Sequence, residues 1–314
     1  MPIFRCALLL ASFAAFPDAS LSQEKKEPPK KVPAPVFTNA AEAGPEFIIQ
    51  GEYEGTLGSA KAGAQVVALG DGKFDVYLLI GGLPGAGWDL KGKEKVDAKT
   101  EEGKVVLTGK FVGGIADGKL TGKSPEGGEF SLAKVERKSP TLGERPPESA
   151  VILFDGKSVD NWNGGKLVEE NLLSVGTSSK KGIAAGKLHL EFRTPFQPKA
   201  RGQGRGNSGV FIQGPEIQVL DSFGLTGAIN ECGAFYNKRK PDVNMCLPPL
   251  SWQTYDVEIS VDEKKRTVAT VLHNGVKIHD KLMIRGDEPK LMSINLQNHG
   301  NPVAYRNIWF AETK

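Results

Sequence analysis

Short segments in which apolar and polar residues alternate, each closed by a glycine-containing turn, extend along most of this chain. Glycine supplies 38 of the 314 residues and proline another 20, so the backbone turns too often for long helices. Alternation with a period of two is typical of strands that bury one face. No stretch keeps the 3.6-residue period of an amphipathic helix. The sequence therefore predicts an all-β protein.

The composition narrows the class of protein further. Charged residues make up 25% of the chain and apolar residues 39%, a balance that allows packed cores. The 40 Lys and Arg residues nearly balance the 37 Asp and Glu residues, which does not indicate a nucleic-acid partner. No apolar run approaches the ~20 residues of a transmembrane helix. At roughly 150 residues per domain, the length predicts two domains.

The N-terminus has the pattern of an export signal. Arg5 precedes the apolar run Cys6–Phe16, and small residues follow. This order predicts a signal peptide over residues 1–22 and hence a periplasmic or secreted protein; a buried N-terminal helix is the alternative. Residues 23–43 begin QEKKEPPKKVPAPV, which predicts an extended Lys/Pro-rich tether.

The rest of the chain divides into two modules. Residues 44–137 alternate short strands with turns such as Gly70-Asp71-Gly72, which predicts a small all-β accessory module. Residues 138–150 (KSPTLGERPPESA) form a Pro-rich linker. Longer alternating segments follow in residues 151–314, and Asn274-Gly275 is typical of a hairpin turn. A two-sheet β-sandwich is the simplest fold for this second module.

Cysteine usage depends on the predicted export. Once Cys6 is removed with the signal, Cys232 and Cys246 remain. An even number of cysteines in an oxidising compartment predicts a disulfide between them, and two buried free thiols are the alternative. Zinc is disfavoured because neither cysteine belongs to a C-x-x-C pair.

The densest group of unusual residues lies between Arg201 and Asp221. By alternation Glu216 and Gln218 share one face of a strand, and Asp221 ends that strand. Carboxylates on a sheet face are one way in which carbohydrate enzymes present an acid and a base. The alternative is that both side chains simply face solvent.

Two further polar groups lie downstream. A predicted strand ends in Gln297 and His299, and the loop after Asp221 combines amides with Tyr236 and Trp252, a mixture typical of sugar sites. A hydrogen-bonded loop histidine is the alternative for His299. The sequence contains neither a G-x-S-x-G motif nor an H-x-x-x-H motif, which argues against a serine hydrolase of that type and a helical zinc site.

Seven motifs follow one another in a fixed order over about residues 150–310. They are Leu153-Phe154-Asp155-Gly156-Lys157 with Trp162, Asn207-Ser208-Gly209-Val210-Phe211, Glu216-Ile217-Gln218-Val219-Leu220-Asp221, Trp252-Gln253-Thr254-Tyr255, Asn274-Gly275-Val276, Leu296-Gln297-Asn298-His299-Gly300 and Arg306-Asn307-Ile308. In these motifs the chain resembles one known family, the 3-keto-α-glucoside lyase/3-keto-2-hydroxy-glucal hydratases, also called 3-keto-disaccharide hydrolases. The resemblance implies a concanavalin-like jelly-roll β-sandwich, bacterial export and a glycoside or oligosaccharide substrate.

The implied substrate suggests a mechanism. A ketone at C3 acidifies the hydrogen on C2 and makes the glycosidic oxygen on C1 a leaving group, so cleavage proceeds by elimination to a 2-hydroxy-glucal, followed by hydration. Our hypothesis makes Glu216 the base, with Asp221 as a weaker alternative, and His299 the proton donor to the leaving oxygen. The predicted substrate-binding residues are Arg193, Asn207, Gln218, Tyr236, Trp252, Gln297 and Arg306.

Three alternatives stay open at this point. A divalent metal held by Glu216, Asp221 and His299 would replace the histidine as Lewis acid. A non-catalytic lectin-like module would use the same sandwich without a reactive carboxylate. A structural envelope protein would suit the tether and the first module, and it would expose an apolar patch.

Overall fold

The computed structural model describes Met1 and residues 34–313 of the chain, so the predicted signal peptide lies outside the described residues, as does the tether up to residue 33. The described part is almost entirely β-structure, which confirms the predicted fold class. Its helical elements are the 3₁₀ turn η1 (Ala40–Glu42), helix α1 (Gly44–Ile49) and the 3₁₀ turn η2 (Gly202–Gly204). None of the described helices is long and apolar enough to span a membrane.

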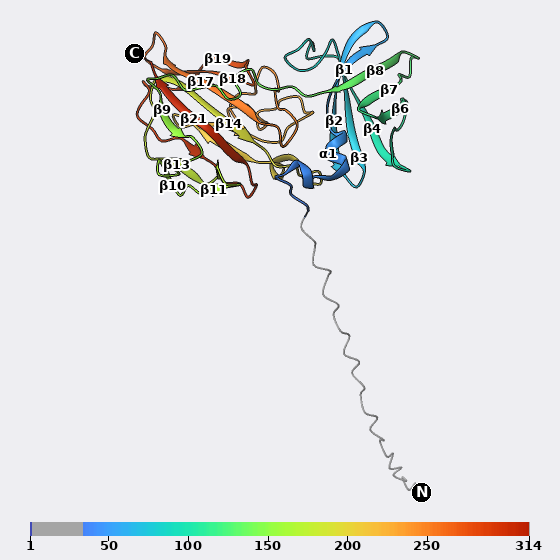
Figure 1. The fold of residues 1–314 in the computed structure, drawn as a ribbon, viewed down its shortest axis with the longest axis horizontal. Coiled ribbons are helices and arrows are strands. Elements are labelled where there is room, and N and C mark those ends of the chain that lie inside the picture. Colours follow the sequence, from blue (N-terminus) through green and yellow to red (C-terminus); the bar gives the residue numbers. More distant parts are fainter. Residues whose placement is uncertain (2–33, 314) are drawn as a thin grey trace. The chain divides into compact units, whose positions relative to one another are not determined.

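The first module is a closed barrel of eight antiparallel strands, in which β8 pairs back onto β1 (Figure 1). Alternation places Tyr53, Phe74 and Leu132 in its core. The tight β2–β3 turn at Asp71-Gly72 has positive φ at both residues, as such hairpins require. The strands are β1 (Gly51–Leu57), β2 (Ala60–Gly70), β3 (Lys73–Ile80), β4 (Lys93–Glu101), β5 (Lys104–Leu107), β6 (Val112–Ala116), β7 (Lys119–Lys123) and β8 (Glu129–Val135).

The second module consists of two sheets that enclose a core including Phe192, Val210 and Tyr255, which confirms the predicted sandwich of jelly-roll type. The smaller sheet has the order β10 (Trp162–Asn163), β13 (Thr177–Ser179), β20 (Asn295–Leu296), β15 (Ser208–Phe211) and β16 (Glu216–Val219). The larger sheet contains β11 (Leu167–Val168), β12 (Leu172–Leu173), β21 (Ala304–Glu312), β14 (Gly186–Arg193), β17 (Gln253–Val261), β18 (Thr267–His273) and β19 (Val276–Arg285), with β9 (Val151–Phe154) paired to β21.

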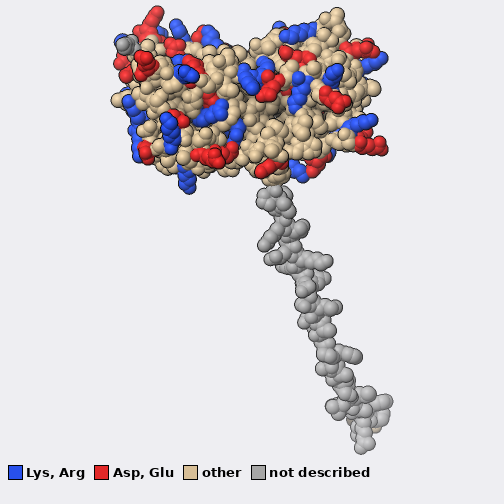
Figure 2. All heavy atoms as spheres, viewed as in Figure 1, with Lys and Arg blue, Asp and Glu red and all other residues tan. Residues whose placement is uncertain are grey.

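Charges of both signs are interspersed on the surface. On the face drawn in Figure 2, Lys and Arg alternate with Asp and Glu, and no large area carries one sign alone. Several of these charges form ion pairs, for example Lys123 with Glu129 and Lys277 with Asp280.

Two segments predicted as spacers also contribute to packing. Phe37, in the predicted tether, forms a β-bridge with Phe196, and the two rings stack with centroids 5.9 Å apart. In the predicted linker, the Ser139 hydroxyl lies 2.6 Å from that of Thr254. Single aromatic and hydroxyl side chains within these Pro-rich segments therefore contact buried residues. The overall composition of such a segment does not predict these contacts.

Phe196 offers a test of this packing. Its ring is fully buried in the barrel core against Phe37 and Phe47, although it lies in the loop that follows β14. We expect Phe196→Ala to lower the free energy of unfolding, measured in urea, by about 3–5 kcal/mol. The control Val112→Ala changes a side chain that is 72% exposed and should shift stability by less than ~0.5 kcal/mol. A loss below about 1 kcal/mol for Phe196→Ala would contradict this packing.

Candidate active site

The register of the smaller sheet brings polar side chains together on its outer face. Val210, Ile217 and Leu296 pack into the sandwich core, so their neighbours along each strand point the other way. Gln218 is paired with Gly209 across β15 and β16. The main-chain nitrogen of Gln297 donates to Gly209 O over 2.9 Å. Gln218, Gly209 and Gln297 therefore form one row across three strands.

Glu216 lies over the middle of this row. A Cβ atom at position 209 would overlap Glu216 Oε1, so the carboxylate occupies the space that glycine leaves free. The side chain is half-buried, and this burial raises the pKa of Glu216 to about 7. An acid with such a pKa exchanges protons readily near neutral pH, as a general acid or base must.

A group of amides adjoins the carboxylate. One end of the Gln218 amide lies 3.0 Å from Glu216 Oε1, and at its other end Gln218 Nε2 donates to Gln203 Oε1 over 3.0 Å. Asn207 Nδ2 donates to Gln203 O over 2.8 Å, and Gln203 Nε2 donates to Asn230 O over 2.7 Å. The sequence analysis missed Gln203, because an amide within a glycine-rich loop gives no periodic signal.

The loop after β16 extends the sheet beside Glu216. Gln218 N donates to Ala234 O, and Tyr236 N donates to Glu216 O over 3.0 Å. Phe235 also forms a β-bridge with Ile217. These bonds fix Tyr236 next to the strand that carries Glu216, as expected for a residue of the same site.

The structure does not place Asp221 with Glu216. The Asp221 carboxylate is buried and pairs with Arg205, with 2.6 Å between Asp221 Oδ2 and Arg205 Nε. Phe223 N donates to its other oxygen over 3.3 Å. A buried carboxylate needs such partners, and here they engage both oxygens in holding the chain after β16. Asp221 is thus engaged in structural bonding, and nothing in this arrangement supports its predicted role as an alternative base.

The structure also bears on His299 and on the metal alternative. His299 is exposed in the turn that follows β20, and Asn301 Nδ2 donates to its main-chain oxygen over 3.1 Å. Within the described residues, Glu216, Asp221 and His299 do not converge as metal ligands; one other trio, with ligand atoms within 4.8 Å of one another, does. The alternative in which these three residues hold a metal therefore has no support among the described residues, where the Asp221 carboxylate is paired with Arg205.

Two predicted substrate-binding residues, Arg193 on β14 and Arg306 on β21, lie on the larger sheet, and a third, Trp252, directly precedes β17 of that sheet. The Arg306 guanidinium lies 3.9 Å above the Trp252 ring, and that of Arg193 lies 5.1 Å from it. Arg306 Nε donates to Glu191 over 2.7 Å. Trp252 also lines a cavity of about 790 Å³ together with barrel residues such as Glu52. Arg193, Trp252 and Arg306 thus form a cluster of their own. The sequence did not predict it, because alternation gives the face on which a residue lies but not its sheet.

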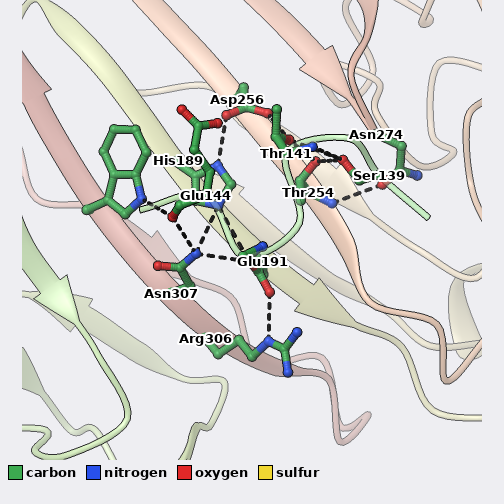
Figure 3. A network of polar contacts seen from close by, with 12 residues as sticks. Ser139, Thr141, Glu144, His189, Glu191, Thr254, Asp256, Asn274, Arg306 and Asn307 are labelled. Atoms are coloured by element: carbon green, nitrogen blue, oxygen red, sulfur yellow. Dashed lines mark hydrogen bonds and ion pairs between the residues drawn. The ribbon is translucent and has the colours of Figure 1, made fainter. Parts of the chain in front are cut away.

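A buried polar network underlies that cluster on the larger sheet (Figure 3). His189 Nδ1 lies 2.8 Å from Asp256 Oδ1, and Gly143 N donates to Glu191 Oε1 over 2.6 Å. Burial opposes the charged form of His189, but its hydrogen bonds to Asp256 and Glu191 outweigh burial and raise its pKa. Burial likewise opposes ionisation of Glu191, but hydrogen bonds from His189, Asn307 and Arg306 lower its pKa to about 2.

This network attaches the predicted linker to the larger sheet. Thr141 Oγ1 donates to Asp256 over 2.7 Å, so linker residues provide part of the bonding. Glu144, His189 and Asp256 are the trio whose ligand atoms converge. The Lys187 ammonium, however, lies 2.8 Å from Glu144 and 3.7 Å from Asp256, where it supplies the positive charge itself. The network is therefore explained as structural bonding.

The predicted disulfide is not formed in this structure, in which Cys232 and Cys246 are buried free thiols. The two thiols lie within hydrogen-bonding reach of each other, so the disulfide stays a prediction. Cys232 Sγ also lies 3.2 Å from the Tyr255 hydroxyl, and Cys246 Sγ donates to Leu220 O over 3.4 Å. Both cysteines pack in the sandwich core as small apolar residues.

Burial of Glu216 also predicts a pH-dependent stability. Its pKa is about 7 in the folded chain and 4.5 ordinarily, so the folded state binds the proton more tightly and loses stability as pH rises from 4.5 to 7. The shift corresponds to at most about 3 kcal/mol, which solvent at this half-buried group reduces to about 1–2 kcal/mol. In urea, Glu216→Gln should therefore exceed the wild type in stability at pH 8 and match it at pH 4. The exposed control Glu258→Gln should show no such trend. A difference in the free energy of unfolding between Glu216→Gln and the wild type that does not change with pH would contradict the raised pKa of Glu216.

Comparisons with known proteins give one family match and two similar crystal structures. The family described as 3-keto-alpha-glucoside-1,2-lyase-like domain matches residues 149–311, just over half of the chain. No curated protein matches. Two crystal structures from Parabacteroides distasonis, for each of which glycosyl hydrolase activity is suggested, resemble the chain. One has 29% identity over 53% of this chain and 85% of its own, with a TM-score of 0.45. The other has 18% identity over 53% and 95%, with a TM-score of 0.41. On the family match, the chain belongs to the carbohydrate-active 3-keto-α-glucoside-1,2-lyase-like family.

Proposed function

We propose that the C-terminal domain cleaves 3-keto-glycosides by elimination, and that Glu216 is the base that removes the proton from C2 of the sugar. The observation that carries this proposal is the half-buried Glu216 carboxylate, whose pKa is raised to about 7 and which lies over Gly209 among amides. The family match supplies the substrate class.

The chemistry requires one base and a set of donors. When Glu216 takes the C2 proton, the electron pair of that bond forms the C2–C3 double bond of an enolate, and negative charge develops on the C3 oxygen. The enolate then collapses: the C3 carbonyl forms again, the electron pair moves into the C1–C2 double bond, and the bond from C1 to the glycosidic oxygen breaks. The departing oxygen takes up a proton. Addition of water then places hydroxyl on C1 and returns a proton to C2, which the protonated Glu216 supplies.

The surrounding amides divide into two groups. The side chains of Gln218 and Asn207 are almost fully buried, and their amide nitrogens already donate to Gln203 and Asn207, so we assign them to holding the shape of the site. Gln297 is half-buried at the other end of the row. We assign Gln297 to the ketone and the sugar hydroxyls, with Tyr236 beside it, because a fixed donor stabilises a developing oxyanion without reorientation.

The proton donor to the leaving oxygen is assigned to the solvent-exposed edge of the site. His299 follows Gln297 by two residues, in the turn at the end of β20. We assign it this role because the departing group must leave through the exposed edge of the site. The proposed enzyme acts outside the cytoplasm, an assignment that rests on the signal pattern of residues 1–22.

A lectin-like binding module is the competing function. Such a module needs amides and aromatic rings, but it has no use for a carboxylate whose pKa is near 7. The environment of Glu216 therefore favours the enzyme.

The test is a panel of 3-keto-glycosides and their unoxidised parents, with release of the aglycone measured in the presence and absence of a chelator. We expect release from the keto forms alone, with or without chelator. Glu216→Gln should slow it by about 10²- to 10⁴-fold, as loss of a general base does. Glu258→Gln, which alters an exposed glutamate on β17, is the matched control and should retain full activity.

Three results would contradict the proposal. Binding of keto-glycosides without release would favour the lectin. Cleavage of the unoxidised parents at a comparable rate would exclude the requirement for a ketone. Full turnover by Glu216→Gln would show that Glu216 is not the base.

A further inference from the structure

The barrel contacts both loops that extend beside the Glu216 site. The first loop, residues 194–207, carries Gln203 and leads to Asn207. The second, residues 220–236, follows β16 and carries Asn230. Both loops have hydrogen-bond or packing partners on strands β2, β3 and β4 of the barrel.

The first loop is fixed to the end of β2. Arg201 donates to Leu69 O over 2.9 Å, and Arg205 donates to Ala68 O over 3.2 Å. Lys199 pairs with Asp71 over 2.6 Å. Arg205 is the same side chain that pairs with Asp221, so this contact connects barrel strand β2 with the chain after β16.

The second loop is fixed by one lysine. Lys93, on β4, donates from Nζ to Gly224 O over 2.6 Å, while its ammonium lies 4.2 Å from the centroid of the Tyr77 ring. Gly224 has a positive φ of 82°, and a Cβ atom there would overlap Val67 Cγ2. The main chain at Gly224 therefore lies directly against the barrel wall.

The two loops are joined to each other beside the site. Gln203 Nε2 in the first loop donates to Asn230 O in the second over 2.7 Å. Gln203 Oε1 accepts from Asn207 Nδ2 over 3.1 Å. A displacement of either loop would thus be transmitted through Gln203 to Asn207, which adjoins Gln218 and Glu216.

We propose that the barrel is a positioning element of the Glu216 site, and that Lys93 is the positioning residue through which it holds the second loop. The part of this inference that concerns catalysis rests on the function proposed above. A partly buried ammonium retains its place only if a strong acceptor compensates for lost hydration, and Gly224 O is that acceptor. Without it, the second loop loses its charged contact with the barrel, and Gln203 and Asn207 lose their fixed positions.

Lys93→Met tests the proposal, because methionine keeps much of the side-chain length and removes the ammonium. Three measurements apply to the full chain: hydrogen exchange of amides 222–231, the titration midpoint of the ¹³C-labelled Glu216 carboxyl, and KM for a 3-keto-glycoside. We expect faster loop exchange, a Glu216 midpoint moved from about 7 toward 4.5, and KM raised at least several-fold with kcat changed less. Lys93→Arg, which retains a donor, should recover most of the wild-type values.

The matched control is Lys99→Met on the same strand. Lys99 pairs with Glu101 over 2.7 Å and has no contact with the second loop among those described. This variant should leave all three measurements unchanged. Should Lys93→Met fail to fold, Gly224→Ala provides a second test, since its added Cβ pushes the loop away from Val67.

The outcomes separate the two proposals. If the wild type cleaves no keto-glycoside, the proposed function fails, while loop exchange and the Glu216 midpoint still decide the role of Lys93. If Lys93→Met cleaves normally, with unchanged loop exchange and an unchanged midpoint, the positioning role is wrong and the proposed function stands.

Discussion

The candidate site depends on the Glu216 carboxylate, which is half-buried and has no paired cation in the described part of the chain. Three carboxylates on the sandwich illustrate how environment sets the role of the same group. Asp221 is fully buried and paired with Arg205, and Glu191 receives bonds from His189, Asn307 and Arg306. Glu216, in contrast, has no ion pair among the described residues, and burial alone shifts its pKa upward. The two paired carboxylates therefore hold the structure, while Glu216 is available to exchange a proton.

The geometry around Glu216 depends on elements far apart in the sequence. Gly209 on β15 provides the space, Gln218 on β16 the neighbouring amide, and Gln297 after β20 the end of the row. The barrel also takes part, because Lys93 and the main chain of β2 form hydrogen bonds with the loops beside that row. A module predicted to be accessory therefore contacts the loops beside the candidate site.

The period-two pattern predicted correctly what depends on local geometry. It placed Glu216 and Gln218 on one strand face opposite Ile217 and Val219, and the pairing of β15 with β16 confirms this arrangement. It also predicted the Asn274-Gly275 hairpin, where both residues have positive φ. These features follow from neighbouring residues alone.

What the sequence did not predict concerns contacts between distant residues. Asp221 looked like a second base, because alternation cannot reveal that Arg205, sixteen positions earlier, pairs with it. Arg193 and Arg306 were grouped with Glu216, whereas the structure places them on the larger sheet, against the Trp252 ring. The disulfide was inferred from an even count of cysteines, and the structure shows Cys232 and Cys246 as neighbouring free thiols.

A carbon-13 NMR titration of the Glu216 carboxyl in the wild-type protein tests the central claim most directly, with Glu216→Gln identifying the resonance. Our account predicts a midpoint near 7, because the half-buried group lacks a compensating cation. A midpoint near the ordinary 4.5 would show that water reaches the carboxylate freely, and it would contradict the assignment of Glu216 as the base of this site.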